Sequence, residues 1–449
     1  MKKMIFLILL ILSNKIISKS KEEWKSRSIY QILTDRFART SNTGSCNLYS
    51  YCGGNYQGLI QKLDYIKNMG FDAIWISPIV ENVENSYHGY HFTNIYKLNP
   101  HFGTEEDFKS LIKACHEKDI WIMVDVVMNH AGLVGVDYSR IYPFNSSEHY
   151  HNVCQITNWE NRWQVENCRL SDLPDLNHEN KWVEKTLLEW INNLVKKYNI
   201  DGLRLDTVME VPKWFWDKFR ESANVFQIGE AFHGIIDYVY DYQNHLDSIF
   251  NYPLYYIIER AFCTGSFYEL EYYWFNSRPK YPTPEYTAIF LENHDNPRFL
   301  NRCKNKSKYI NAVVFSFLYE GIPVFYYGGE QFFSGGNEPQ NREPMWDKYN
   351  TNSELYILLG KLNEFRKKVK IWNYDIVQRY ADDHFYAFTR GNILACFTNS
   401  NSFQRRITYH EFKNNDKLCN ILDDSDCVTV SNQNIIINMK DYPKVYVKQ

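Results

Sequence analysis

The sequence has little net charge and no apolar run long enough to cross a membrane. Its 449 residues include 50 Lys and Arg against 53 Asp and Glu, a formal net charge of −3. This balance argues against nucleic acid or an anionic membrane surface as a partner. A spanning helix needs about 20 apolar residues, and the run Met4–Leu12 is too short. Short repeats and low-complexity tracts are also absent, and 44% hydrophobic residues can form a large core in two or three domains.

The N-terminus nevertheless predicts export. Lys2 and Lys3 precede the run Met4–Leu12, and polar residues follow it, which is typical of a secretory signal peptide over residues 1–20. We therefore expect an extracellular protein whose ten cysteines are partly joined in disulfides. The sequons at Asn145 and Asn305 are consistent with export. Close spacing favours the pairs Cys46/Cys52, Cys154/Cys168 and Cys419/Cys427; Cys263/Cys303 is a further candidate pair, and Cys115 and Cys396 are expected to be buried free thiols.

Strands and helices alternate along the first part of the chain. Ser28–Phe37 and Ala73–Ser77 read as strands, with a helix over Tyr56–Met69 between them. Thr104, followed by three acidic residues, is a helix N-cap signal, and Trp121–Val127 is a third strand. Strands and helices that alternate at this spacing predict a parallel sheet.

The alternation stops after His130 and resumes later. Residues 131–177 lack clean periodicity, and so long an insertion is functional or a small domain. A helix over Trp182–Tyr198 restarts the pattern, and Glu354–Val369 is its last helix. From Ile371 onward, short alternating runs between polar turns predict an antiparallel sandwich. The expected strands between the two helices begin near Gly202, Val225, Ser248, Thr287 and Val324.

Four apolar runs end in acidic or histidine residues. Asp206 ends the run from Gly202, Glu230 the run from Phe226, and Asp295 the run from Ala288. The fourth run, Trp121–His130, carries Asp125 and ends in Asn129 and His130. A single Asp after a strand is usually only the N-cap of the next helix. Several strands that deliver such residues at their C-terminal ends are typical of the active site of a parallel barrel.

These four segments, in this order, resemble the signature regions of the α-amylase family, family 13 of the glycoside hydrolases, and Leu173–Asn177 resembles a fifth. The resemblance is closest to fungal-type α-amylases and covers nearly the whole chain after the first two dozen residues. It implies a (β/α)8 TIM barrel, domain A, over residues 21–130 and 178–370. It also implies a domain B at 131–177, inserted after the third strand, and a β-sandwich, domain C, at 371–449, with no starch-binding module after it. Cys46/Cys52 and Cys154/Cys168 match disulfides of fungal relatives.

The resemblance also implies the roles of the acids. Asp206 matches the nucleophile, Glu230 the general acid/base and Asp295 the third acid, which holds the distorted sugar. A nearby arginine favours an ionised carboxylate, so Arg204 is expected to keep Asp206 charged. Neighbouring acids are expected to raise the pKa of Glu230, as a proton donor requires. The residues matching sugar contacts are His88, Tyr90, His130, Arg204, His294, Glu338 and Arg342.

Each of these residues also has a simpler interpretation. A solitary histidine is more often a hydrogen-bonded core residue, and Glu338 with Arg342 could be a surface ion pair. Glu338 stands where relatives have the shorter Asp, and the motif context favours sugar contacts for the three histidines.

A calcium site is implied by oxygen ligands from two parts of the chain. Asn129, Glu166 and Asp175 match the family's calcium ligands, joined by the backbone carbonyl of Glu210. Oxygen donors suit a hard cation such as Ca²⁺. Asn129 and Glu210 belong to the predicted barrel, whereas Glu166 and Asp175 belong to the insertion, so one ion would join the two. The simpler interpretation, without an ion, is that Asp175 is a turn residue and that Glu166 is a solvent-exposed charge.

The chain departs from its relatives beside the predicted nucleophile. Fungal amylases usually have Lys and His where this chain has Met209 and Glu210, and many have Trp where this chain has His91. Met offers no hydrogen-bond donor and Glu brings a negative charge. We therefore expect weaker binding of sugars on the leaving-group side, unless neighbouring loops supply other contacts.

The sequence predicts a secreted, monomeric, endo-acting α-amylase. It would hydrolyse internal α-1,4-glucosidic bonds of starch, glycogen and maltooligosaccharides with retention of configuration. A maltogenic amylase or a transglycosylase of the same family would share every catalytic residue and stays an alternative. A non-catalytic, amylase-like sugar-binding protein is the other alternative; such a protein would not need Glu230.

Overall fold

The structure, a computed structural model, describes residues 19–41 and 45–449. Nearly all of the predicted signal peptide, residues 1–20, lies outside the described residues. Only residues 19 and 20 of it are described, and Ser20 is the N-cap of the short helix α1 (Lys21–Trp24). In the part of the chain that is described, no helix is both long and apolar enough to cross a bilayer.

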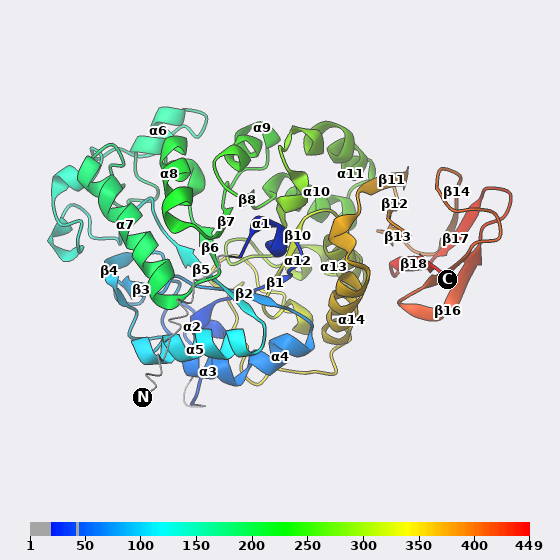
Figure 1. Cartoon of the computed structure of the whole chain (residues 1–449), viewed down its shortest axis with the longest axis horizontal. Coiled ribbons are helices and arrows are strands. Elements are labelled where there is room, and N and C mark those ends of the chain that lie inside the picture. The colour runs from blue at the N-terminus through cyan, green and yellow to red at the C-terminus, as the bar shows by residue number, and fades with distance from the viewer. Residues whose placement is uncertain (1–18, 42–44) are drawn as a thin grey trace, which may run out of the picture.

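Eight parallel strands form a barrel in the middle of the molecule (Figure 1). They are hydrogen-bonded in the order β8-β7-β6-β5-β2-β1-β10-β9. A parallel bridge between Phe250 and Ala288 joins the two ends of this order and closes the ring. The strands are β1 (Ile29–Ile32), β2 (Ala73–Ile76), β5 (Trp121–Val126), β6 (Gly202–Leu205), β7 (Phe226–Gly229), β8 (Ser248–Ile249), β9 (Ala288–Ile289) and β10 (Ile322–Tyr326).

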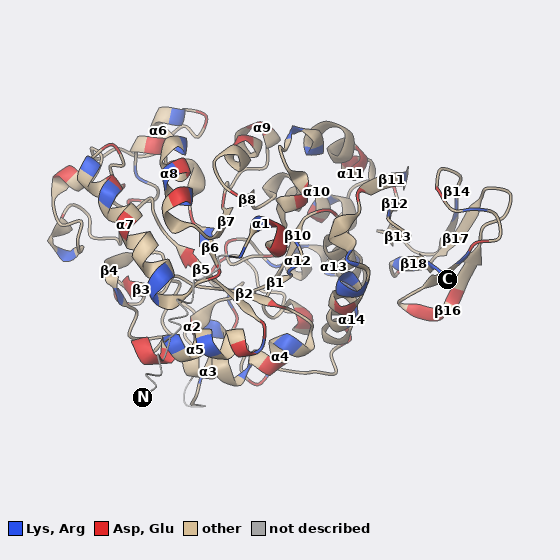
Figure 2. Cartoon of the chain, viewed as in Figure 1, with Lys and Arg blue, Asp and Glu red and all other residues tan. Residues whose placement is uncertain are grey.

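Helices surround the barrel, and the longer ones carry the apolar faces that cover it. Their charged residues of both signs alternate along the outer surfaces of α5, α7 and α8 (Figure 2). The longer helices are α5 (Glu105–Glu117), α7 (Lys181–Tyr198), α8 (Lys213–Ala223), α10 (Tyr252–Cys263), α13 (Lys306–Leu318) and α14 (Glu354–Val369). The shorter helices are α2 (Thr34–Phe37), α3 (Tyr56–Gln61), α4 (Leu63–Asn68), α6 (Arg162–Asn167), α9 (Ile236–Val239), α11 (Tyr268–Tyr272) and α12 (Phe299–Cys303).

Helix α1 closes the end of the barrel at which the strands begin. The Trp24 ring lies 5.1 Å from the rings of Trp121 and Phe226, and its Nε1 donates to the carbonyl of Asp201. Gly202 allows this approach, because a Cβ there would lie 2.7 Å from the Trp24 ring. This end is therefore filled with apolar side chains, and the C-terminal ends of the strands are left for the polar residues.

Two predicted elements are wrong in their extent. The first strand was expected to run from Ser28 to Phe37, but it ends at Ile32, and Thr34–Phe37 form α2. The buried Asp35 explains the turn, because its carboxylate accepts hydrogen bonds from the backbone of Cys52 and Gly53. The predicted helix Tyr56–Met69 is divided into α3 and α4 at Lys62. The helix predicted from the Thr104 cap is α5, and Thr104 and Asp107 form a reciprocal capping box.

The insertion after β5 contains little regular structure. The segment between β5 and α7 contains α6 and the 3-10 turns Tyr138–Arg140 and Ser147–His149. A parallel bridge from Asn94 to Tyr142 attaches it to the antiparallel pair β3 (Val80–Asn82) and β4 (Phe92–Leu98), which was not predicted.

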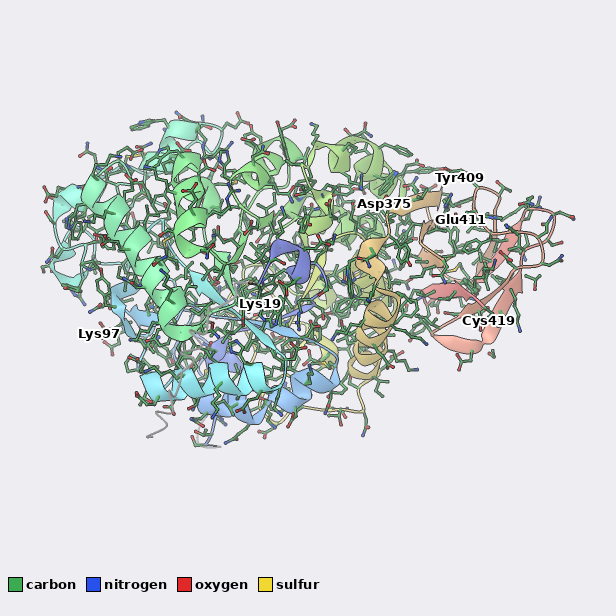
Figure 3. All side chains as sticks on the ribbon, viewed as in Figure 1. Lys19, Lys97, Asp375, Tyr409, Glu411 and Cys419 are labelled. Atoms are coloured by element: carbon green, nitrogen blue, oxygen red, sulfur yellow. A yellow bond between two sulfur atoms is a disulfide. The ribbon has the colours of Figure 1, made fainter. Side chains whose placement is uncertain are left out.

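Two antiparallel sheets form the C-terminal sandwich. Six strands pair in the order β11-β12-β13-β18-β15-β16, and β14 pairs with β17. Side chains of both sheets, including Leu394 and Ile437, share one buried cluster, as the alternating sequence predicted. Figure 3 shows Cys419 in this sandwich, far from Lys97 at the other end of the molecule. The strands are β11 (Ile376–Ala381), β12 (Phe385–Arg390), β13 (Ile393–Thr398), β14 (Phe403–Ile407), β15 (Lys417–Asn420), β16 (Asp423–Thr429), β17 (Ile435–Met439) and β18 (Lys444–Lys448).

The cysteines are paired as the spacing indicated. All four candidate disulfides are formed, including the pair Cys263–Cys303. Cys115 and Cys396 are buried free thiols, as expected. Because stable disulfides are typical of oxidising compartments, this pattern agrees with an exported protein.

Candidate active site

One buried guanidinium binds carboxylates from three neighbouring strands. Arg204, at 1% exposure, lies on β6, and its Nη1 is 2.7 Å from Asp206 Oδ1 at the end of the same strand. Its Nη2 lies 2.7 Å from Glu230 Oε1, which follows β7. Both oxygens of Asp125 on β5 accept from Nη1 at 3.0 Å. Arg204 thus holds three acids together at the C-terminal ends of adjacent parallel strands.

Asp125 is the acid of this group that the sequence analysis did not select. Besides Arg204, it accepts hydrogen bonds from the Tyr90 hydroxyl at 2.8 Å and from Trp75 Nε1 at 3.1 Å. Burial raises the pKa of Asp125 to about 7, and the nearby Arg204 opposes that rise. The sequence did contain a signal, because Asp125 lies in the run Trp121–His130 that was singled out.

Glu230 is an acid that favours its protonated form. Burial raises its pKa well above the ordinary value for Glu, and Arg204 opposes the rise. The charges of Asp206, Asp295 and Asp125 raise it further. The expected direction is therefore confirmed, but burial rather than the neighbouring acids is the largest cause.

His294, Asp295 and Arg342 form the opposite side of the site. His294 Nδ1 accepts from Gln31 Nε2 at 2.9 Å, and its Nε2 lies 3.4 Å from Asp295 Oδ2. Burial lowers the pKa of His294 well below its ordinary value, which favours the neutral ring. Arg342 donates from Nε to the His294 carbonyl at 2.9 Å and from Nη1 to Glu338 Oε1 at 2.5 Å. Glu338 thus forms an ion pair with Arg342, as its simpler interpretation predicted, but this pair lies at the edge of the site.

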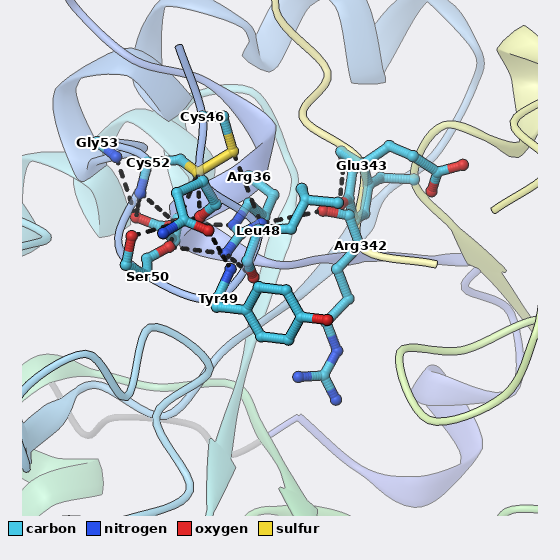
Figure 4. Close-up of a disulfide and its surroundings, with 12 residues drawn as sticks. Arg36, Cys46, Leu48, Tyr49, Ser50, Cys52, Gly53, Arg342 and Glu343 are labelled. Atoms are coloured by element: carbon cyan, nitrogen blue, oxygen red, sulfur yellow. Dashed lines mark hydrogen bonds and ion pairs between the residues drawn. A yellow bond between two sulfur atoms is a disulfide. The ribbon is translucent and has the colours of Figure 1, made fainter. Parts of the chain in front are cut away.

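Arg36 connects the first disulfide loop to the backbone of Arg342, as Figure 4 shows. Arg36 donates to the carbonyl of Arg342 at 3.3 Å and to the carbonyls of Leu48 and Ser50 at 3.0 and 2.9 Å. The loop that contains these two carbonyls is closed by the Cys46–Cys52 disulfide. The disulfide therefore constrains a segment that supports the site.

Three stacked rings, those of His88, Tyr90 and His294, line one part of the site. The Tyr90 ring stacks between His294, at 5.2 Å between centroids, and His88, at 5.5 Å. His130 Nε2 lies 3.1 Å from the Tyr90 carbonyl. The turn before Tyr90 needs Gly89, whose φ of 91° lies in the left-handed region and where a Cβ would meet Pro78 at 2.9 Å.

A cleft of about 530 Å³ joins these groups. The three acids selected from the sequence line it, as do all of the predicted sugar-contact residues except Arg204, which lies buried beneath. The sequence analysis missed the aromatic side chains of Trp159 and Phe232, which also line the cleft and are 50% and 45% exposed. Their residue types alone gave no signal, because most aromatic residues belong to the core.

Three of the four predicted calcium ligands lie together. The side-chain amide of Asn129 is 3.0 Å from Asp175 Oδ1 and 3.2 Å from the Glu210 carbonyl oxygen. If the amide oxygen of Asn129 faces Asp175 and Glu210, three oxygens converge on one point. If the amide nitrogen faces them instead, it donates hydrogen bonds to both. The Glu166 carboxylate is instead paired with Arg162. Among the described residues, no cluster of three or more His, Cys, Asp or Glu side chains is arranged to hold a metal. The predicted set contributes only two carboxylates, because Glu210 takes part through its backbone carbonyl.

Comparison with known proteins identifies the family of this site. A model of the α-amylase catalytic domain matches residues 31–373. The chain belongs to the α-amylase family. It is 41% identical over 407 residues to an α-amylase of Saccharomycopsis fibuligera, covering 85% of this chain and 82% of that protein. Among solved structures, an α-amylase from Malbranchea cinnamomea superposes with a TM-score of 0.92 at 36% identity, covering 96% of this chain and 98% of the other.

The fold of this chain is also similar to that of a transferase. A cyclomaltodextrin glucanotransferase with a three-domain ABC distribution superposes with a TM-score of 0.85 at 26% identity, covering 94% of this chain and 98% of the other. Membership of the α-amylase family makes the enzyme a glycoside hydrolase and confirms the predicted fold.

Proposed function

We propose that this α-amylase family enzyme hydrolyses internal α-1,4-glucosidic bonds of starch, glycogen and maltooligosaccharides with retention of configuration. The observation that carries the proposal is the guanidinium of Arg204, shared by Asp206 and Glu230 at 2.7 Å each. Two carboxylates bound to one guanidinium are close neighbours. A retaining glycosidase needs such a pair at about 5–5.5 Å, whereas inversion needs about 6.5–9.5 Å.

The reaction proceeds in two displacements. The carboxylate of Asp206, which Arg204 binds, attacks the anomeric carbon while Glu230 passes its proton to the leaving glycosidic oxygen. The leaving chain departs with that proton, and the sugar stays bound to Asp206 as an ester. Glu230, now ionised, removes a proton from water, the water oxygen attacks the anomeric carbon, and Asp206 is released.

The remaining cleft residues hold the substrate. Asp295 accepts hydrogen bonds from sugar hydroxyls beside the reacting ring, and Arg342 and Glu338 bind the sugar at the far end. His88, His130 and His294 line the cleft beside the sugar hydroxyls, and Tyr90 offers an aromatic face. The lowered pKa values of His88 and His294, caused by burial, support neutral rings that can both donate and accept.

Calcium is part of the proposal because the oxygens at Asn129 fit it. Asn129, Asp175 and the carbonyl of Glu210 would hold the ion, with Glu166 joining from α6. The ion would fix the insertion, taken as domain B at residues 131–177, to the barrel wall of the cleft. Its contribution is structural, and no step of the reaction passes through it.

Secretion and a monomeric state complete the proposal. Four disulfides, exposed sequons at Asn145 and Asn305 and the N-terminal sequence support an extracellular enzyme. The test is to follow soluble starch digestion by NMR and chromatography. We expect the α-anomer first and a mixture of oligosaccharides from internal cuts. Early β-anomer would overturn retention, and maltose or cyclic products alone would overturn endo-hydrolysis in favour of a maltogenic or transferase activity.

A further inference from the structure

Tyr252 contacts the same carboxylate oxygen of Glu230 that Arg204 binds. It is the first residue of α10, it is 1% exposed, and its hydroxyl lies 3.2 Å from Glu230 Oε1. Its ring packs against Phe232 at 4.4 Å and Phe290 at 5.0 Å between centroids. A buried ring that packs against two other rings in this way keeps its hydroxyl in one position.

The direction of this hydrogen bond is fixed by Asn293. Asn293 Oδ1 accepts from the backbone of Asp295 and from the backbone and side chain of Asn296, at 3.0–3.1 Å. These donors force Nδ2 toward Tyr252, where it donates to the hydroxyl oxygen at 2.8 Å. The tyrosine oxygen therefore accepts from Asn293, and its own hydrogen is directed to Glu230.

Glu230 Oε1 consequently receives two donors. Arg204 Nη2 lies 2.7 Å from it and the Tyr252 hydroxyl 3.2 Å from it. Of the described residues, the protein donor recorded at Oε2 is the backbone N–H of Thr207, at the long distance of 3.4 Å. A proton on Oε1 would face two hydrogens, so a proton carried by Glu230 belongs on Oε2.

We propose that Tyr252 is a positioning residue that, together with Arg204, keeps Oε1 of Glu230 as an acceptor and so directs the transferable proton to Oε2. The proposal rests on the proposed role of Glu230 as the general acid. The other charged groups that face Glu230 are Asp206 after β6, Asp125 on β5 and Asp295 after β9. Among the described residues, the donors to the Glu230 carboxylate are Arg204, Tyr252 and the backbone of Thr207, so none of these acids takes the place of the hydroxyl.

The substitution Tyr252→Phe removes the hydroxyl and keeps the ring. The matched control is Tyr255→Phe on the same helix. The buried hydroxyl that it removes lies 3.3 Å from Arg302 Nη2 and not beside Glu230. Each variant is assayed by kcat/KM on maltopentaose, whose leaving sugar needs a proton, and on α-maltotriosyl fluoride, whose fluoride leaves without one. The ratio of the two values does not depend on the fraction of folded enzyme, so partial unfolding cannot imitate the effect.

We expect Tyr252→Phe to lower kcat/KM on maltopentaose by about tenfold, part of the 10²–10⁴-fold that a general acid contributes, with little change on the fluoride. Loss of a donor to the ionised carboxylate also raises the pKa of Glu230, so the alkaline limb of the rate profile should move up by roughly one pH unit. Tyr255→Phe should change neither measurement.

Equal losses on both substrates, or an unmoved alkaline limb, would overturn the positioning role of Tyr252. Glu230→Gln separates this outcome from failure of the proposed function. If Glu230→Gln itself does not spare the fluoride, the assignment of Glu230 as the acid is wrong. If Glu230→Gln spares the fluoride and Tyr252→Phe does not, only the role of Tyr252 is wrong.

Discussion

Replacing Glu230 with glutamine is expected to stabilise the protein at neutral pH while removing most of its activity. Glutamine has the shape of the protonated acid, so its oxygen can accept from Arg204 and Tyr252 as Oε1 does, and its amide stands in for the protonated Oε2. The amide cannot give up a proton at the leaving oxygen. We expect starch hydrolysis to fall by about 10²–10⁴-fold.

The stability change follows from the pKa of Glu230. In the unfolded chain a Glu titrates near 4.3, and burial raises the folded value well above that. A raised folded pKa gives stability that is fully present below about pH 4.3 and is lost as the pH rises through the folded pKa. The wild type loses about 1.4 kcal/mol for each unit of that rise, and Glu230→Gln does not.

The assay is a series of thermal melts from pH 4 to pH 8. The melting temperature of Glu230→Gln minus that of the wild type should increase across this range. One kcal/mol corresponds to roughly 2–4 °C in domains of about 150–250 residues, and to less in a longer chain. The matched control is Glu364→Gln on the exposed face of α14, which should follow the wild type at every pH. A variant that melts progressively lower than the wild type as the pH rises would refute the reasoning.

Three further predictions concern the ion, the exposed ring of Phe232 in the cleft, and the leaving-group side. Chelation with EDTA should lower the melting temperature and the activity together, because an ion that binds only the folded state stabilises it, and added Ca²⁺ should restore both; unchanged values would contradict the calcium proposal. Phe232→Ala should lower kcat/KM on short oligomers several-fold. Phe275→Ala also removes an exposed ring, but one away from the cleft, and should leave kcat/KM unchanged. Equal effects of the two substitutions would exclude a substrate contact of Phe232. Met209→Lys combined with Glu210→His should raise the rate on maltotriose relative to starch several-fold, since one hydrogen bond to a sugar is worth roughly 0.5–1.5 kcal/mol; a constant ratio would show that these positions do not set binding on that side.

The sequence could predict the acids of the site because their positions follow from local rules. Alternation along a strand places Arg204 and Asp206 on the same side, and parallel strands bring their C-terminal ends together. The three acids that end apolar runs therefore had to meet once the chain formed a parallel barrel. The short disulfide pairs were predictable for the same reason, since their partners are close in the chain.

The rest of the site depends on contacts between residues of ordinary core types. Tyr252 and Glu230 are 22 positions apart, and Asn293 and Tyr252 are 41 positions apart. A tyrosine that begins an apolar helix and an asparagine in a loop carry no local mark of such a contact. Helix α2 was missed for a similar reason, because Asp35 is fixed by the backbone of Cys52 and Gly53, some 17 residues away.

The charges of the site explain how a buried carboxyl can serve as an acid. Asp125, Asp206, Glu230 and Asp295 face two guanidiniums, Arg204 and Arg342. With four acids and two permanent positive charges in a low-dielectric site, ionising every carboxyl is strongly unfavourable. Glu230 retains a proton because burial raises its pKa and the charges of the other three acids raise it further. Asp206 is bound by Arg204 at 2.7 Å and lines the cleft, where its carboxylate can reach a bound sugar. The same arrangement that weakens the fold as the pH rises thus separates a proton donor from a nucleophile.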